Sequence, residues 1–177
     1  DVNFFTKDRL SSIPVINLRF ASVPNQEIAE IASREYPDSA QRAIFQIYQD
    51  AGQRIAITGA PGAGKSYVVG HLLEALWNRA RYDSTQPIPV LIPAFTLQGG
   101  VGRDITYLLA QTIRELLLKN TGQANVITLR QAIMSGNIIV LIDGLSEMLP
   151  GRTNETMQAL MADYARNYPL VVTCNDD

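Results

Sequence analysis

The chain has few of the residues that build disulfides or metal clusters, and it has no long apolar run. Its 177 residues contain one cysteine and one histidine. A lone cysteine, Cys174, excludes an internal disulfide and a metal site made of several cysteines, and it fits a reducing compartment. Wholly apolar runs such as residues 138–142 are far shorter than the roughly 20 residues of a membrane helix, and no secretory signal opens the chain. We therefore expect a cytoplasmic protein without a membrane partner.

The chain also lacks a large excess of charge of either sign. There are 15 Lys and Arg against 17 Asp and Glu, a net charge of −2, whereas a sequence-independent grip on nucleic acid needs many basic residues at phosphates. The length and the 46% hydrophobic content are those of one globular domain. The chain begins at Asp1 rather than at methionine and stops just after a predicted strand. We therefore expect it to belong to a longer protein, whose other domains are its partners.

A glycine-rich loop is the strongest motif in the sequence. It consists of Gly59, Ala60, Pro61, Gly62, Ala63, Gly64, Lys65 and Ser66, and it fits the phosphate-loop spacing G-x-x-x-x-G-K-[ST] without a mismatch. A β-type run over residues 54–58 precedes it, and a helical pattern over residues 67–81 follows. In this order, backbone N–H groups point into one concavity and the helix N-terminus adds partial positive charge. The alternative is a glycine-rich turn that carries Lys-Ser by chance.

Each residue type in the loop has a physical role. Gly62 and Gly64 can adopt positive φ and leave no Cβ between the backbone and a phosphate. Lys65 supplies a point charge for the β- and γ-phosphates, and Ser66 supplies a hydroxyl for Mg²⁺. Tyr67, which follows directly, is included among the predicted nucleotide contacts. The loop thus predicts a nucleoside triphosphate as ligand, with Mg²⁺ as cofactor.

Strand-like and helix-like segments alternate along the chain. Strands are predicted over residues 54–58, 89–95, 138–143 and 169–173, and helices over residues 67–81, 104–119, 128–134 and 154–167. This alternation predicts βαβ units in a parallel sheet with helices on both faces, with right-handed crossovers that place the strand ends and the loop on one edge. The near-continuous apolar content of residues 89–95 predicts a strand buried on both faces.

The beginning of the chain carries no recognisable chemistry. Residues 1–37 are interpreted as an N-terminal extension or linker, with a strand-like stretch over residues 14–20 and a short helix over residues 26–35. A helix over residues 38–50 begins the core, which is predicted to cover residues 38–177. The glycine-rich residues 99–102 are interpreted as a connection, because no Lys follows them in a phosphate-loop pattern.

A second acid follows the apolar strand over residues 138–143. Asp143 ends this strand and can reach the Mg²⁺ held by Ser66, directly or through water; the alternative is an Asp that caps a turn. Many phosphate-loop ATPases have Glu directly after this Asp to polarise water, and Gly144 stands there instead. Glu147 is therefore the candidate to orient or deprotonate the attacking water. Its alternative is a solvated Glu stabilised by a helix dipole.

These motifs resemble those of the NACHT group within the STAND class of signalling NTPases. Residues 135–150 are similar to the second signature of that group, residues 59–66 to its phosphate loop, residues 88–95 to its second strand, and residues 168–173 to the strand with the γ-phosphate sensor. The resemblance covers about residues 50–175. It implies a three-layer P-loop NTPase fold of the ASCE type, an α/β fold, whose last strand and helical lid would follow Asp177.

The sequence departs from the NACHT pattern at two places. The group usually has Asp where Ser146 stands, which implies a weaker acidic cluster and slow hydrolysis. It usually has Thr-Ser-Arg after the sensor strand, where this chain has Thr173, Cys174 and Asn175. An Asn here is similar to the sensor residue of AAA+ ATPases, so Thr173 and Asn175 are both candidates to contact the γ-phosphate or the attacking water.

The resemblance implies a regulatory ATPase that acts as a nucleotide-dependent switch, together with nucleotide-dependent self-association. The first alternative is an AAA+ motor, with Arg152 and Arg166 as candidate arginine fingers. A GTPase is less favoured, because Ser146 stands where Asp-x-x-Gly needs Gly and residues 173–176 lack the Lys of the guanine-reading motif. A small-molecule kinase and a binding-only domain that does not hydrolyse its ligand remain as further alternatives.

Overall fold

A computed structural model describes residues 15–17, 48–49, 54–97, 104–118, 125–148 and 159–175. Several of the predicted features lie outside these residues. They are the helix over residues 26–35, the first part of the helix over residues 38–50, the connection at residues 99–102 and Arg152.

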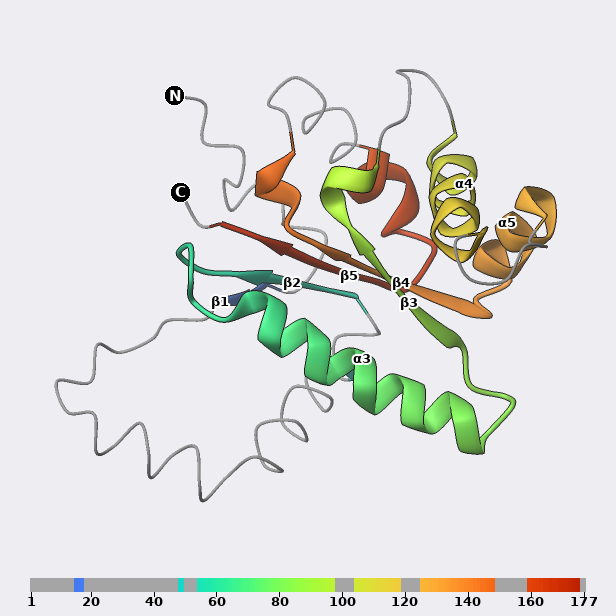
Figure 1. The fold of residues 1–177 in the computed structure, drawn as a ribbon, viewed down its shortest axis with the longest axis horizontal. Coiled ribbons are helices and arrows are strands. Elements are labelled where there is room, and N and C mark those ends of the chain that lie inside the picture. The colour runs from blue at the N-terminus through green and yellow to red at the C-terminus, as the bar shows by residue number, and fades with distance from the viewer. Residues whose placement is uncertain are drawn as a thin grey trace, which may run out of the picture.

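A parallel sheet of five strands forms the centre of the protein (Figure 1). The strands are β1 (Val15–Asn17), β2 (Arg54–Thr58), β3 (Ile88–Pro93), β4 (Ile138–Asp143) and β5 (Leu170–Cys174). Their order across the sheet is β1-β2-β5-β4-β3, and every neighbouring pair is parallel. The predicted α/β fold with a parallel sheet is therefore confirmed. The strand-like stretch in the predicted extension forms β1, which pairs with β2 at one end of the sheet.

Two apolar layers cover the two faces of this sheet. Side chains of β4 alternate between them, with Val140 and Ile142 on one face and Ile139 and Leu141 on the other, as the period of two in a strand requires. Helix α3 (Lys65–Tyr82) packs on the face of Ile139, and α4 (Ile105–Leu118) and α5 (Val126–Met134) pack on the opposite face (Figure 1). Helices on both faces were predicted, and they are present.

Strand β3 contacts both apolar layers but is only partly buried. The apolar content of residues 89–95 predicted burial on both faces, and Val90 and Ile92 pack in one layer and Leu91 in the other. Val90 and Leu91 are only half-buried, because β3 lies at the end of the sheet. Proline has no N–H to donate to a second neighbour, so the two prolines of β3 suit an edge position. The strand also ends at Pro93, and the 3-10 turn Ala94–Thr96 follows, in which Phe95 is exposed.

The helices begin close to the predicted positions. α3 starts at Lys65, inside the predicted loop, and buries Val69, Leu72 and Leu76 against the sheet. α5 starts two residues earlier than predicted, because the side chain of Asn125 caps it by accepting the Ile127 N–H at 2.9 Å. None of the described helices is long and apolar enough to cross a membrane.

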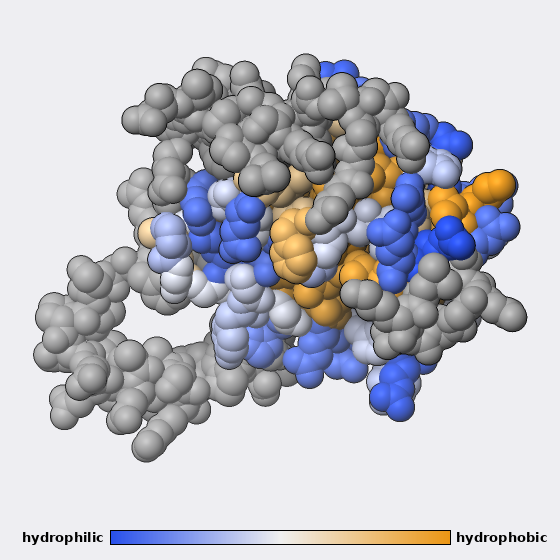
Figure 2. All heavy atoms as spheres, turned by 45° about the horizontal axis from the view of Figure 1, so that its top comes forward, coloured by the Kyte–Doolittle hydropathy of each residue, from blue (hydrophilic) through white to orange (hydrophobic). Residues whose placement is uncertain are grey.

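The segment before β5 is less regular than predicted. A continuous helix was expected over residues 154–167, and its described part is a π-type turn, Leu160–Tyr164. Leu160 and Tyr164 are both buried. On the face of the molecule drawn in Figure 2, one group of hydrophobic side chains lies near the middle and another at the right edge, with hydrophilic side chains between them.

Candidate functional site

The glycine-rich loop connects the end of β2 to the start of α3. Gly62 and Gly64 have φ of 79° and 82°, the left-handed values that favour glycine. The Ala63 N–H donates to the Ala60 carbonyl at 3.0 Å and tightens the loop, and the first bond of α3 runs from the Val68 N–H to the Gly64 carbonyl at 3.0 Å. The N–H groups that precede Val68 in the first helical turn therefore have no acceptor within the helix, and a helix binds anions through such groups.

Lys65 folds back over the loop. Its Nζ donates to the carbonyl oxygens of Gly59 at 2.8 Å and Ala60 at 2.9 Å. The side chain is half-buried, whereas that of Ser66 is exposed. The ammonium group is thus held next to the backbone of the loop by neutral acceptors.

Asp143 lies at the end of β4, and its carboxylate is bonded to the neighbouring strand. The Thr173 hydroxyl on β5 donates to Asp143 Oδ1 at 2.5 Å and accepts the Gly144 N–H at 2.7 Å. Thr173 is fully buried. Its hydroxyl therefore joins the acid to the residue after it.

A second bond joins the same two segments. The Asn175 N–H, at the end of β5, donates to Ser146 Oγ at 3.2 Å. The hydroxyl of Ser146 thus accepts a backbone N–H. The Asp143 turn, meaning residues 143–147, is tied to the end of β5 at two places.

Glu147 ends a 3-10 turn, Leu145–Glu147, rather than beginning a helix. Its N–H donates to the Gly144 carbonyl at 2.9 Å, and its carboxylate lies over the α-carbon of Gly144. A Cβ on residue 144 would stand 3.0 Å from Glu147 Cδ and 3.0 Å from Oε2. Gly144 also has φ of 79°. The turn therefore needs glycine for its backbone and for the room that the carboxylate occupies.

The predicted site residues meet at one edge of the sheet. The loop follows β2, the Asp143 turn follows β4, and the end of β5 lies between them, with Thr58 of β2 opposite Cys174 of β5. Within the described part of the chain, no hydrogen bond joins the loop to Asp143 directly. Strand order and parallel direction alone bring these carboxyl ends together.

Two further predicted residues have distinct surroundings. Tyr67 is 72% exposed, and its ring meets the edge of the His71 ring at 4.2 Å between centroids. Arg166 precedes β5, and its carbonyl accepts from Arg54 at the start of β2. Arg166 therefore lies at the opposite edge of the sheet from the loop, so it does not act as an arginine finger for the loop of its own chain.

The sequence did not predict the Thr173–Asp143 bond or the contact of Glu147 with Gly144. Thr173 and Asp143 are 30 positions apart, and nothing local in either segment specifies the pairing. The one available signal was chemical, because a hydroxyl and a carboxylate stood at the ends of two predicted strands. Strand order was needed to show that these strands are neighbours.

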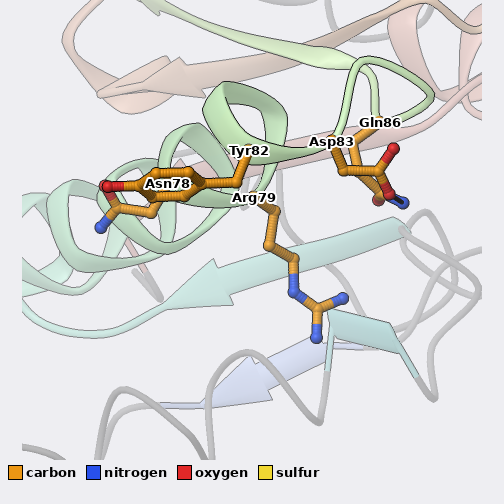
Figure 3. Close-up of a pocket in the computed structure, with 5 residues that line it drawn as sticks. All are labelled: Asn78, Arg79, Tyr82, Asp83 and Gln86. Carbon is orange, nitrogen blue, oxygen red and sulfur yellow. Dashed lines mark hydrogen bonds between the residues drawn. The ribbon is translucent and has the colours of Figure 1, made fainter.

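A pocket of about 430 Å³ lies at the far end of α3 from the loop (Figure 3). Asn78, Arg79, Tyr82, Asp83 and Gln86 line it. The hydroxyl of Thr85 is the main cause of the lowered pKa of the Asp83 carboxyl, and Gln86 also donates to this carboxylate, at 3.0 Å. The pocket is thus separate from the candidate site at the carboxyl edge of the sheet.

Comparisons with known proteins leave the motif residues as the basis for any assignment to a family. No protein-family model matches the chain, and no curated protein matches it in sequence. The geometry of the loop, the Asp143 turn and the end of β5 is therefore the basis of the proposals below.

Proposed function

We propose that this chain is an ATP-binding regulatory domain with a three-layer P-loop NTPase core of the ASCE type, similar to the NACHT group. One observation carries the proposal. The strand order β2-β5-β4 sets the glycine-rich loop and the Asp143 turn at the same edge, with the end of β5 between them. A triphosphate held by the loop then extends its γ-phosphate toward Asp143, Glu147 and the end of β5.

Lys65 would change its hydrogen-bond acceptors when a triphosphate binds. Its ammonium group now bonds to two neutral carbonyl oxygens of the loop. Phosphate oxygens are charged acceptors, and hydrogen bonds between charged partners are about twice as strong as those between neutral ones. We expect Lys65 to exchange the carbonyl oxygens for β- and γ-phosphate oxygens on binding, while the N–H groups of the loop enclose the β-phosphate.

The residues at the site suit Mg²⁺ bound together with a nucleotide. Among the described residues, no group of three His, Cys, Asp or Glu side chains could hold a metal ion. Mg²⁺ in nucleotide sites is usually bound by one or two protein ligands and by phosphate oxygens. The Ser66 hydroxyl and the Asp143 carboxylate fit that role, and Mg²⁺ would neutralise charge on the phosphates.

Hydrolysis at this site would use Glu147. Its carboxylate lies over Gly144, beside the acid that would hold the ion. From there it can orient or deprotonate a water molecule for attack on the γ-phosphate. Because a hydroxyl replaces the acid usual at Ser146, we expect turnover to be slow.

A regulatory switch requires contacts that differ between the triphosphate and the diphosphate. The γ-phosphate would contact the Asp143 turn only before hydrolysis, and the ion held by Asp143 would then lose a phosphate ligand. Since the turn is bonded to Thr173 and to the Asn175 N–H, a change at Asp143 also reaches the end of β5. Other domains of a longer protein, or a second copy of the chain, would respond to that change.

A thermal-shift titration with Mg-ATP, Mg-GTP and Mg-ADP tests the proposal. A ligand at 100 times its Kd adds about 2.7 kcal/mol of stability, and each kcal/mol raises the Tm of a domain of this size by roughly 2–4 °C. We expect Mg-ATP to raise the Tm by several degrees, and Lys65→Ala to abolish the increase. Arg114→Ala, which removes an exposed positive charge from α4, is the control and should respond like the wild type.

The three nucleotides separate the alternatives. A larger shift with Mg-GTP than with Mg-ATP would overturn the assignment to ATP. An equal shift with Lys65→Ala would contradict the site, and the absence of any shift in the wild type would contradict nucleotide binding by this chain.

A further inference from the structure

Thr173 is a polar side chain that is fully buried and whose hydroxyl bonds on both sides. It donates its one hydrogen to Asp143 Oδ1 at 2.5 Å and accepts the Gly144 N–H at 2.7 Å. A threonine hydroxyl has a single hydrogen to donate. It therefore cannot donate to a γ-phosphate while it holds Asp143.

The two bonds define the geometry of the acid. With Oδ1 held by Thr173, the plane of the Asp143 carboxylate is set and Oδ2 is the oxygen without a protein partner among the described residues. The bond from Gly144 fixes the residue at which the 3-10 turn that carries Glu147 begins. One hydroxyl thus orients both the acid and the turn behind it.

We propose that Thr173 is a positioning residue for the magnesium ion rather than a phosphate contact. Its hydroxyl holds Asp143 by Oδ1 and leaves Oδ2 to bind the ion, which Ser66 would also hold. This inference rests on the proposed function. Partners that orient a metal ligand in this way typically contribute 10- to 100-fold to metal affinity.

Three variants separate positioning from general support of the fold. Thr173→Val keeps the shape of the side chain and removes the hydroxyl, and Thr173→Ser keeps the hydroxyl. Thr112→Val is the matched control, because Thr112 is also buried and its hydroxyl donates to the Leu108 carbonyl at 3.0 Å, within α4. Both valine variants lose one buried hydroxyl, and only Thr173→Val loses it at Asp143.

The measurement is the Kd of ATP by calorimetry, with Mg²⁺ and with a chelator. The Kd in chelator divided by the Kd with Mg²⁺ reports how much the ion contributes to binding. We expect Thr173→Val to lower this ratio about 10-fold or more, with the Kd in chelator unchanged. Thr173→Ser and Thr112→Val should keep the wild-type ratio. Amide exchange should show faster exchange of the Gly144 N–H in Thr173→Val alone.

Two results would overturn the role of Thr173 while leaving nucleotide binding intact. They are a Kd in Thr173→Val that equals the wild-type value both with and without Mg²⁺, or an equal loss of affinity under the two conditions, which would mark a phosphate contact or a structural effect. Failure of the proposed function itself gives a different result. The wild type would then show no ATP binding that Lys65→Ala abolishes, which would contradict both proposals.

Discussion

The carboxylate of Glu147 occupies the space into which a side chain of Gly144 would extend. A Cβ on residue 144 would lie 3.0 Å from both Glu147 Cδ and Oε2. Many phosphate-loop ATPases carry a glutamate at the position directly after the strand-end Asp, where this chain has Gly144. The turn Leu145–Glu147 brings a carboxylate from three positions further along the chain to that place. On the proposed function, hydrolysis would therefore depend on a glycine at residue 144.

Replacing Gly144 by alanine should impair hydrolysis more than binding. The new methyl group displaces the Glu147 carboxylate, and a left-handed backbone costs a non-glycine residue about 1–2 kcal/mol. We expect a lower kcat for ATP and a lower Tm, with the Kd of Mg-ATP nearly unchanged. Gly136→Ala is the control, because Gly136 has φ of 74° and a Cβ there would meet nothing within 4 Å. It should lower the Tm similarly and leave kcat unchanged.

Glu147→Gln tests the carboxylate itself. The amide has the same size but cannot accept a proton, and general-base catalysis contributes roughly 10²- to 10⁴-fold to a rate. We expect phosphate release to slow by about 10²-fold or more and ATP binding to persist. Turnover equal to that of the wild type would show that Glu147 has only a structural role.

Asp104 caps α4 and connects it to α5. Its Oδ1 accepts the Thr106 N–H at 2.8 Å and the Thr106 hydroxyl at 2.6 Å, and Arg130 of α5 donates to its Oδ2. Asp104→Ala removes these acceptors, and loss of such a cap costs about 1 kcal/mol. We therefore expect a Tm lower by roughly 2–4 °C at pH 7.

The contribution of Asp104 should also depend on pH. The pKa of the Asp104 carboxyl is lowered, and the hydrogen bond from the Thr106 hydroxyl is the largest cause. Partial burial opposes this effect, and the Thr106 N–H and the charge of Arg130 add to it. Because the pKa is lower in the folded state, the stabilisation is present above the ordinary pKa of about 3.9 and is lost as the pH falls below it. The Tm difference between wild type and Asp104→Ala should shrink between pH 5 and pH 2.5. A constant difference would contradict a role for the charged form.

The buried hydroxyl of Tyr164 should lower the stability of the fold. Tyr164 is fully buried, and its hydroxyl has no hydrogen-bond partner among the described residues. An unsatisfied buried polar group costs about 1–3 kcal/mol, so Tyr164→Phe should raise the free energy of unfolding at pH 7 by about 1 kcal/mol. Denaturation in urea measures this value. Tyr168→Phe is the control, because Tyr168 is only half-buried beside it, and it should leave the free energy unchanged.

Alkaline pH should enlarge the difference for Tyr164→Phe. Burial, together with the nearby Tyr168 and Tyr48, raises the pKa of the Tyr164 hydroxyl above its ordinary value. The unfolded chain then loses this proton near pH 10 while the folded chain keeps it, so the wild type loses stability as the pH rises above about 10. The variant should lose less. Equal losses in the two proteins would contradict the burial of this hydroxyl.

The sequence alone determined the local features of this protein. The bounds of β2 and β4 and the loop between β2 and α3 follow from apolar runs, glycines and one motif, which act over a few residues. Period and turn chemistry are encoded locally, so they can be predicted without a partner strand. The candidate residues Lys65, Ser66 and Asp143 came from the same local signals.

Tertiary structure alone decided which of these segments are neighbours. The position of β5 between β2 and β4, the pairing of β1 with β2 and the edge position of β3 depend on contacts between residues far apart in the chain. The same holds for the bond from Thr173 to Asp143. An apolar run indicates a strand but does not identify the strand beside it, and for β3 it did not show the edge position. For that reason the sequence predicted the chemical groups of the site, and the sheet order determined how they are held together.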